Sequence, residues 1–422
     1  MMTRRNLLKA SGVLGAATVT APKVEAWSSV PTLPDKANFR VQEFETCLNA
    51  GRWHPLSNGA RAAVDRYHEY KQRGIWDKTD IDKPADPTMH GGSQMEAKRL
   101  FAELIGASVD EVAFVQSTTA AENLVVRSLG LPAAGKNIVT DGLHFDGSLY
   151  LYEAMRREGA DVRVVRPRGW EVQLADMERA IDGNTRLVAV SKISYVNGFE
   201  HDLKALCKVA HERGALVYAD VVQAAGAMPI DVRELGVDFC ACASYKWLMG
   251  DFGLGFLYVR KALLGAEVVR PVHSYRQISN FTTHLLPDDP AGAPGKPEIE
   301  WEQSQTAAGF FEQGTLANPI TETLAYSLQY IQTLGVANIQ RHSQGLIGRM
   351  RAEIPKLGFE CITPIGARGP LVTFLVKDPG SLGKRLWAAK VDVTIVADRI
   401  RVSPSVYNDE GDVERLLRVL KG

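Results

Sequence analysis

The sequence has few cysteines and no excess of either charge. Its 49 Lys and Arg residues balance 49 Asp and Glu residues, which argues against a broad basic surface for nucleic acid. With 45% hydrophobic and 23% charged residues, composition excludes a disordered chain, a collagen and a multi-span membrane protein. No CxxC pair or Cys/His cluster supports a metal site. The cysteines are scattered and odd in number: Cys47, Cys207, Cys240, Cys242 and Cys361.

The N-terminus carries the pattern of a targeting segment. Arg4 and Arg5 stand before a mildly apolar stretch, residues 10–21, that is too short to span a bilayer. Residues 1–26 are therefore predicted to be a twin-arginine export signal, which implies the twin-arginine translocase as a partner and a periplasmic location. The alternative is an amphipathic tail with a chance arginine pair. Residues 27–45 are expected to form an N-terminal segment.

The central part of the chain alternates short apolar runs with longer amphipathic segments such as 202–212. This alternation predicts an α/β fold whose mainly parallel, seven-stranded sheet is covered by helices on both faces. Ligands gather at the carboxyl ends of such strands, so residues there are the first candidates for a site. The expected strands cover residues 111–115, 137–140, 161–165, 186–190, 215–218, 239–242 and 254–259.

The last quarter of the chain has a different pattern. After a Pro- and Gly-rich loop at 287–297 comes a long helical pattern over 320–354, with a final helix at 410–420. Strands are expected near 359–362 and 371–376. We therefore predict a large domain over residues 46–319, and a connecting helix with a small C-terminal α+β domain over 320–422.

Two predicted strand ends carry residues suited to a phosphate and an aromatic ring. Hydroxyl residues at 116–123 open a helix, where unpaired N–H groups and the helix dipole favour a phosphate. Taken alone, Ser117 or Thr118 could equally be an ordinary N-cap. His144 and Phe145 follow the second strand, where an aromatic residue could either pack or face a ligand.

Two further strand ends carry an acid and a lysine. Asp220 ends one apolar strand with Gln223 after it, and Lys246 follows the next strand. A lysine at such a place has its pKa lowered by burial, which suits Schiff-base chemistry, although a surface loop lysine is the commoner case. Asp220 could also cap a helix. Together with the phosphate cradle and the aromatic residue, this order of features matches a pyridoxal phosphate (PLP) site.

The chain resembles class V aminotransferases of PLP fold type I, the group that contains cysteine desulfurases, kynureninases and isopenicillin-N-epimerase-like proteins. The resemblance begins near Leu48 and covers most of the chain. With the export signal, it is similar to the periplasmic, pyoverdine-tailoring enzymes of this family. The motifs that carry it are Ser117–Thr119, Tyr218–Gln223, Ala243–Leu248, Phe311–Thr315 and Arg399–Pro404.

The resemblance implies a role for each matching residue. Lys246 would be the catalytic Schiff-base lysine, and Asp220 the catalytic partner of the pyridine nitrogen. Arg401 would bind the substrate α-carboxylate, as a planar guanidinium does bidentately. The remaining cofactor contacts would come from Thr118, Thr119 and Tyr245 at the phosphate, Phe145 on the ring with His144 as its alternative, Gln223 at the phenolic oxygen, and Gly314 and Thr315 reaching the phosphate of a neighbouring subunit in a homodimer.

The reaction remains open at this level, because the fold supports several chemistries. Cysteine desulfurases use a mobile cysteine, whereas Cys361 lies in an apolar pattern typical of a buried thiol. The 250–253 segment, Gly-Asp-Phe-Gly, departs from the usual Gly-Pro-Phe-Gly. We expect aminotransferase- or epimerase-like chemistry on an amino acid or peptide, as in siderophore tailoring. The alternatives are a C–S or C–C lyase, desulfurase-like or kynureninase-like, and a non-catalytic exported binding protein.

Overall fold

A computed structural model describes residues 31–73, 92–281 and 301–422. The predicted export signal and the 287–297 loop lie outside these residues. All seven expected strands form and belong to one sheet, in the order β2-β8-β7-β6-β5-β3-β4. The pairs β4–β3, β3–β5, β5–β6 and β6–β7 are parallel, and only β8 is antiparallel to its neighbours. The strands are β2 (Val112–Val115), β3 (Asn137–Asp141), β4 (Asp161–Val165), β5 (Thr185–Ser191), β6 (Leu216–Asp220), β7 (Phe239–Ala243) and β8 (Gly255–Val259).

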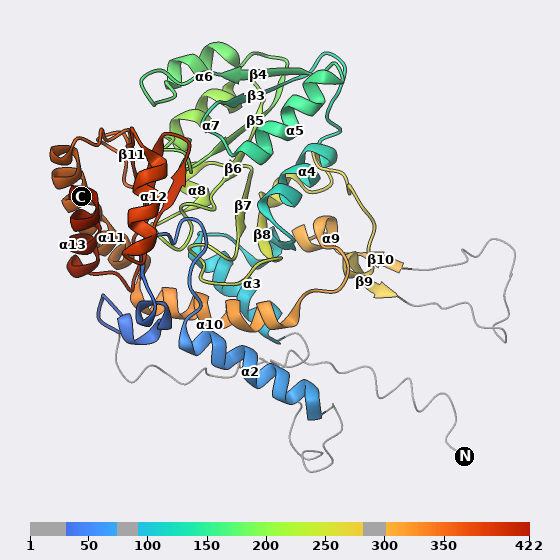
Figure 1. Ribbon diagram of the computed structural model, residues 1–422. Coiled ribbons are helices and arrows are strands. Elements are labelled where there is room, and N and C mark those ends of the chain that lie inside the picture. The colour runs from blue at the N-terminus through green and yellow to red at the C-terminus, as the bar shows by residue number, and fades with distance from the viewer. Residues whose placement is uncertain (1–30, 74–91, 282–300) are drawn as a thin grey trace, which may run out of the picture.

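Helices cover both faces of this sheet, as the alternating pattern predicts (Figure 1). Strand β6 shows why, because its alternate side chains enter different cores. Val217 and Ala219 pack into the core beneath α3, α7 and α8, whereas Leu216 and Tyr218 pack into the core beneath α4 and α5. The helices are α3 (Ser93–Leu104), α4 (Thr118–Ser128), α5 (Asp146–Arg157), α6 (Leu174–Ala180), α7 (Leu203–Glu212) and α8 (Val232–Leu235).

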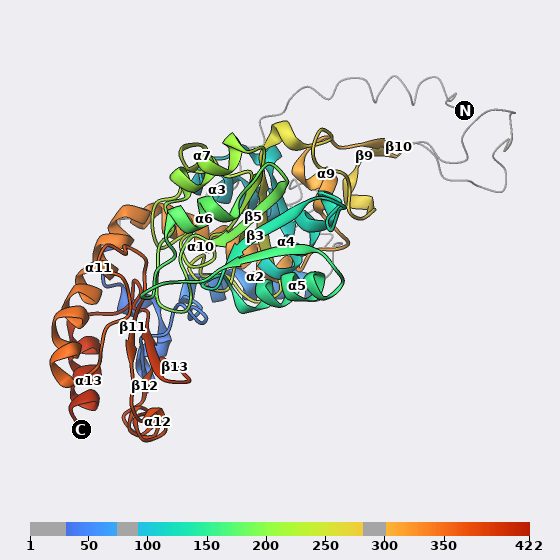
Figure 2. The ribbon, with the colours of Figure 1, turned by 90° about the horizontal axis from the view of Figure 1, so that it is seen from above.

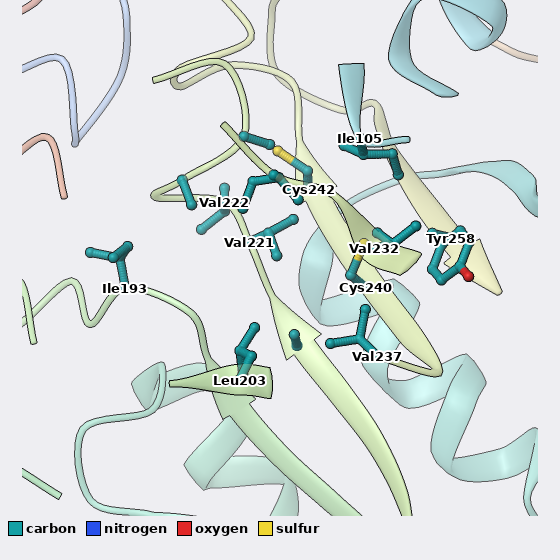
Figure 3. Close-up of a cluster of buried hydrophobic side chains, with 14 of the residues drawn as sticks. Ile105, Ile193, Leu203, Val221, Val222, Val232, Val237, Cys240, Cys242 and Tyr258 are labelled. Carbon is teal, nitrogen blue, oxygen red and sulfur yellow. The ribbon is translucent and has the colours of Figure 1, made fainter. Parts of the chain in front are cut away.

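The larger core sits directly behind the predicted site. Figure 3 shows Val221 and Val222, which follow β6, gathered with Cys240 and Cys242 of β7 and with Val232 of α8. These side chains are almost completely buried. The strand ends that carry the candidate residues are therefore held by tightly packed apolar side chains.

The C-terminal part forms a smaller α+β unit beside the sheet (Figure 2). The expected 320–354 helix is wrong as one element: it divides at Gly335, whose φ of +77° ends the first helix. The 359–362 strand is also wrong, because only Cys361 forms a bridge, to Phe374, before Pro364 interrupts the pattern. The elements are α10 (Asn318–Leu334), α11 (Val336–Glu353), β11 (Val372–Leu375), α12 (Pro379–Ala388), β12 (Val391–Asp392), β13 (Thr394–Val396), β14 (Arg399–Val402) and α13 (Glu410–Lys421).

The start of the described chain is joined to both parts. Strand β1 (Thr46–Cys47) pairs in parallel with β12, and Leu48 lies in the core of the smaller unit. Helix α2 (Asn58–Arg73) runs along α10 (Figure 1). A hairpin of β9 (Ile278–Phe281) and β10 (Trp301–Gln303) precedes α9 (Ala307–Phe311). None of the helices in the described residues is long and apolar enough to cross a membrane.

Candidate active site

Asp220 and Lys246 lie at the same edge of the sheet. Asp220 is the last residue of β6, and Lys246 lies in the turn after the neighbouring strand β7. Their exposed fractions are 2% and 9%. Asp220 does not cap an α-helix: one carboxylate oxygen accepts a hydrogen bond from the Val222 N–H at 2.8 Å, within a turn. The side chains of both residues therefore end in a buried, polar place.

The two charges lack the partners that burial normally demands. Within the described residues, the Lys246 amine makes no hydrogen bond or ion pair, and the second Asp220 oxygen has no partner. Burial lowers the pKa of Lys246 to about 8, although the Asp220 charge opposes this shift. Burial also raises the pKa of Asp220, opposed by the Val222 N–H and the charges of His144 and Lys246. Both groups are poised to accept a ligand between them.

The turn that carries Lys246 is firmly held. The Ser244 hydroxyl donates to the carbonyl of Leu254 at 2.7 Å, and Met249 adopts a φ of +56°. The unusual Asp251 accepts a hydrogen bond from the Phe252 N–H at 2.7 Å, and the Phe252 ring stacks on Tyr245 with centroids 4.5 Å apart. In the Gly-Asp-Phe-Gly segment, Asp251 thus makes a local carboxylate contact at the position where proline is usual.

The N-terminus of α4 faces the same edge. The Ser117 side chain caps the helix by accepting from the Ala120 N–H at 3.1 Å. The backbone N–H groups of Thr118 and Thr119 have no acceptor among the described residues. The capping interpretation and the phosphate interpretation are therefore compatible, because the cap satisfies one N–H and leaves two at the positive end of the helix dipole.

His144 and Phe145 have different environments. His144 is fully enclosed, with Nε2 3.0 Å from Glu122 Oε1 and Nδ1 2.8 Å from Ser191 Oγ. Burial lowers the pKa of His144, but the Glu122 carboxylate outweighs it and the pKa is raised overall. Phe145 is only partly buried, and its ring meets Tyr195 edge-on at 5.5 Å. Both ring nitrogens of His144 therefore have partners, whereas the Phe145 ring contacts Tyr195 and is partly exposed.

Gln223 and Tyr245 are fixed through other contacts. The Gln223 amide donates to the Gly51 carbonyl at 2.9 Å and accepts from the Trp247 indole at 2.8 Å, which leaves one N–H unused. Tyr245 is partly buried, its backbone carbonyl accepts from the His54 N–H, and burial raises the pKa of its hydroxyl. The free donors of both side chains remain available to a ligand.

Arg401 reaches the site from β14 of the smaller unit. It is 7% exposed, donates to the Tyr195 carbonyl at 2.9 Å and to the Thr394 hydroxyl at 3.1 Å, and its Nε has no partner. The Thr394 hydroxyl in turn donates to the Asn49 side chain at 2.6 Å. Burial, with a smaller contribution from the nearby Arg52 charge, lowers the pKa of Arg401 to about 10. Among the described residues, this buried cation has no carboxylate partner.

Gly314 and Thr315 lie apart from these groups. Both residues are exposed, and Gly314 has a φ of +55°. The Gly314 N–H donates to Ser274 Oγ at 3.0 Å, and the Thr315 hydroxyl pairs with the Tyr275 hydroxyl at 3.1 Å. A single subunit therefore presents them at its surface. Nearby, Arg276 pairs with Glu312 at 2.8 Å.

Sequence reasoning missed three positions around the site. Glu122 accepts hydrogen bonds from Ser148 and Tyr152 as well as from His144, yet nothing in its helical context distinguishes it from a surface acid. Arg52 lines a cavity beside Arg401, and none of the sequence motifs contains it. Arg399 has no individual role in the sequence motif that contains it, although its spacing of two from Arg401 on a strand places both side chains on one face.

Four of the five thiols are buried, and Cys361 is partly exposed. Burial raises the pKa of Cys47 and of Cys207 to about 12. Burial likewise raises the thiol pKa of Cys240 and Cys242, both in β7. Cys361 sits in its bridge to β11, with Sγ 3.8 Å from the Thr363 carbonyl. Since a thiolate is the reactive form, burial keeps the thiols of Cys47, Cys207, Cys240 and Cys242 unreactive.

These features fit a phosphorylated pyridine coenzyme. A free acid oxygen suits a protonated ring nitrogen, an unpartnered lysine suits a carbonyl group, and bare helix N–H groups suit a phosphate. Each is a buried or helix-end polar group without a protein partner in the described part of the chain. Arg401 is a further buried charged residue of this site, and its Nε has no partner.

Comparison with known proteins agrees with this picture. The chain is 31% identical to a probable cysteine desulfurase of Methanothermobacter thermautotrophicus over 63% of this chain and 62% of that protein. It is 28% identical to an uncharacterized aminotransferase of Bacillus subtilis over 88% of this chain and 91% of the relative. Residues 1–21 match the family model of the twin-arginine translocation signal.

Solved structures share the fold. A cysteine desulfurase from Thermococcus onnurineus superposes with a TM-score of 0.79 at 22% identity, covering 93% of this chain and 98% of its own. The lyase C-DES, with glycine covalently linked to PLP, gives 0.78 at 22% identity over 92% and 99%. The family model "Aminotransferase class-V" matches residues 89–381. The chain therefore belongs to the class V aminotransferase family of PLP-dependent enzymes.

Proposed function

We propose that this protein is an exported PLP-dependent enzyme that acts at the α-carbon of an amino acid, free or in a peptide, with aminotransferase- or epimerase-like chemistry. The observation that carries the proposal is the pair of buried side chains Asp220 and Lys246. Asp220 has one free carboxylate oxygen, and the Lys246 amine makes no hydrogen bond or ion pair among the described residues. A chain that had lost catalysis would have no need of this costly pair. The non-catalytic binding protein is therefore the weaker alternative.

The coenzyme would be held by residues at the sheet edge. Thr118 and Thr119 at the α4 N-terminus, with the Tyr245 hydroxyl, would bind its phosphate, and Asp220 would hold the pyridine nitrogen protonated. Phe145 would cover the ring, and the remaining Gln223 N–H would bind the phenolic oxygen. When bound, PLP supplies an electron sink that lowers the energy of a carbanion at the substrate α-carbon.

The residues of the chain would then direct the proton. A lysine with a pKa of about 8 is partly neutral near neutral pH, so Lys246 can accept a proton from the α-carbon and return it. Arg401 would bind the α-carboxylate through its fork and its free Nε. Return of a proton to the α-carbon by Lys246 alone would keep the configuration, so epimerisation would need a second proton donor on the opposite face. Transamination would instead need Lys246 to move the proton from the α-carbon to the coenzyme.

A persulfide route is disfavoured, although several relatives carry the name cysteine desulfurase. All five cysteines lie in the described residues, and four are buried with raised pKa values. The β13–β14 hairpin that carries Arg401 turns tightly through Ala397 and Asp398, without a thiol. A C–S or C–C lyase reaction needs no protein thiol, so it remains the second candidate, supported by the likeness to C-DES.

Export and subunit association complete the proposal. The signal at residues 1–21 supports transport by the twin-arginine translocase into the periplasm, a route that carries folded, coenzyme-loaded proteins. The substrate would then be a molecule met outside the cytoplasm, such as a peptide-derived siderophore or another secondary metabolite. The exposed Gly314–Thr315 segment would reach the phosphate of a second copy in a homodimer. An Arg4→Lys/Arg5→Lys variant should remain in the cytoplasm on fractionation.

The decisive experiment is a visible spectrum of the purified protein before and after an amino-acid and peptide panel, without any keto-acid acceptor. The absorption band of lysine-bound coenzyme is expected at the start. Its lasting loss to the amine form of the coenzyme would indicate transamination, whereas a shift followed by recovery would indicate epimerase or lyase chemistry. A protein that shows no such band after PLP is supplied would contradict the proposal.

A further inference from the structure

A cavity beside Arg401 is lined by arginines and by no acid. Its volume is about 170 Å³, and it opens next to the residue proposed to bind the α-carboxylate. The lining comes from three separate parts of the chain: the loop after β1, the turn after β5 and the β13–β14 hairpin. The lining residues are Arg52, Tyr195, Val196, Thr394, Val396, Arg399 and Arg401.

The hairpin explains why two of the arginines face the same way. Arg399 and Arg401 alternate with Ile400, which is fully buried in the smaller core on the opposite face. The antiparallel register places Val396 opposite Arg399 and Thr394 opposite Arg401. The wall of the cavity is thus a small sheet face that carries two guanidinium groups, and Arg52 arrives from the other side.

The positive charges of this cavity are poorly neutralised. Arg401 is bound only by a carbonyl and a hydroxyl, with Nε unpartnered. Arg399 has one acidic neighbour, Asp398 at 3.5 Å, which is 64% exposed, so solvent screens that pair strongly. The Arg52 side chain has no acceptor among the described residues, and its charge lowers the pKa of Arg401. Clustered guanidinium groups of this kind are stabilised when anions bind.

One α-carboxylate does not account for this arrangement. Bound by Arg401, it would neutralise a single positive charge and leave Arg52 and Arg399 facing the rest of the substrate. Arg52 is exposed and Arg399 is partly buried, and a neutral substrate side chain would give neither guanidinium group a charged partner. A second carboxylate a few bonds from the α-carbon would fit between them, because the planar guanidinium fork binds carboxylates bidentately.

We propose that Arg52 and Arg399 bind a side-chain carboxylate, and that the substrate is an acidic amino acid, free or at a terminus with an open α-amine. This inference rests on the proposed function, since it assumes that Arg401 binds the α-carboxylate of the same molecule. Tyr195, whose hydroxyl bonds Asp146, and Thr394, which holds Arg401, position the two anion sites relative to each other.

Calorimetric titration of the holoenzyme with unreactive analogues tests the inference without turnover. Glutarate and succinate, which carry two carboxylates, are expected to bind about 10-fold tighter than butyrate, as one further charge-assisted contact implies. Arg52→Gln and Arg399→Gln should each reduce this ratio, and the double variant should abolish it while butyrate binding persists. The matched control is Arg415→Gln on the exposed face of α13, which should leave the ratio unchanged.

The possible outcomes distinguish a failure of this inference from a failure of the proposed function. Equal affinity for glutarate and butyrate, or a preference that survives in the double variant, would overturn the acidic side-chain site. The same preparation shows whether lysine-bound coenzyme is present by its visible band. If the coenzyme band is present but dicarboxylates bind no more tightly than butyrate, only this inference is wrong. If the band is absent after PLP has been added, both the proposed function and this inference are wrong.

Discussion

Two groups of buried charged residues, one around Glu122 and one at Asp220 and Lys246, are close enough to interact electrostatically, and they differ in how many hydrogen-bond partners they have. Glu122 accepts hydrogen bonds from His144, Ser148 and Tyr152. Asp220 and Lys246, in contrast, have almost no partners in the described residues. Burial costs a charge the same in both places. The difference indicates that the first group stabilises the fold and that the second is kept for a ligand.

The strongest test of this distinction is Lys246→Ala. Turnover should fall by at least about 10³-fold, because both the coenzyme attachment and the proton carrier are lost, while the thermal midpoint should not fall, because a buried unpaired cation has been removed. Steady-state rates and calorimetry measure the two effects. Lys356→Ala, at an exposed position, is the control; activity retained by Lys246→Ala would invalidate the division between the groups.

Asp220→Asn is expected to have the next largest effect. The amide keeps the acceptor for the Val222 N–H but removes the charge that would keep the ring nitrogen protonated. We expect a loss of about 10²-fold in kcat, with PLP still bound and a shifted visible spectrum. A variant with normal kcat would mean that Asp220 is a structural acid, like Glu122.

Glu122→Gln should act on stability instead. Removing one member of the buried network should lower the free energy of unfolding by about 3 kcal/mol. Glu122 raises the pKa of His144 overall in the folded protein. The stabilisation of the folded state by this pair is therefore fully present below the unfolded pKa of histidine, about 6.5. It disappears as the pH rises through the pKa of His144 in the folded state. Denaturant unfolding across this range measures it. If Glu122→Gln lowers the free energy of unfolding by the same amount at every pH, His144 is neutral in the folded protein.

The pH dependence of coenzyme uptake gives a smaller effect. Only the neutral amine can attack a carbonyl group, and the pKa of Lys246 is about 8. The rate of reconstitution of the PLP-free protein should therefore rise about tenfold for each pH unit below that value and level off above it. Stopped-flow absorbance follows the reaction. A profile that continues to rise to pH 10 would indicate a solvated lysine.

The smallest effect is expected for Cys361→Ala, which belongs to neither group. Its thiol lies beside β11 and bonds no charged residue. Turnover of any amino-acid substrate should change by less than about 2-fold, the scale of a neutral surface change. A loss of sulfur release from cysteine in this variant, with other activities intact, would reinstate the desulfurase interpretation.

Some of the fold and site was open to sequence reasoning because it depends on local patterns. The β-strand runs, the α7 N-cap by Asp202 and the α4 N-cap by Ser117 were all predictable. The division of the 320–354 helix at Gly335 was missed, since one glycine in a helical pattern is often tolerated. The domain boundaries and the individual coenzyme contacts remain predictions.

The sequence by itself determined the order of strand-end residues, from Thr118 through Asp220 to Lys246, because parallel strands bring such residues to one edge whatever the loops do. Only the tertiary structure decided which charges have partners. Glu122 and Arg52 look alike as charged residues in the sequence, yet one is surrounded by donors and the other faces a cavity. Hydrogen-bond partners and cavities are formed by segments that are distant in the chain. The free-energy cost of burying a charge therefore depends on contacts that exist only in the folded protein.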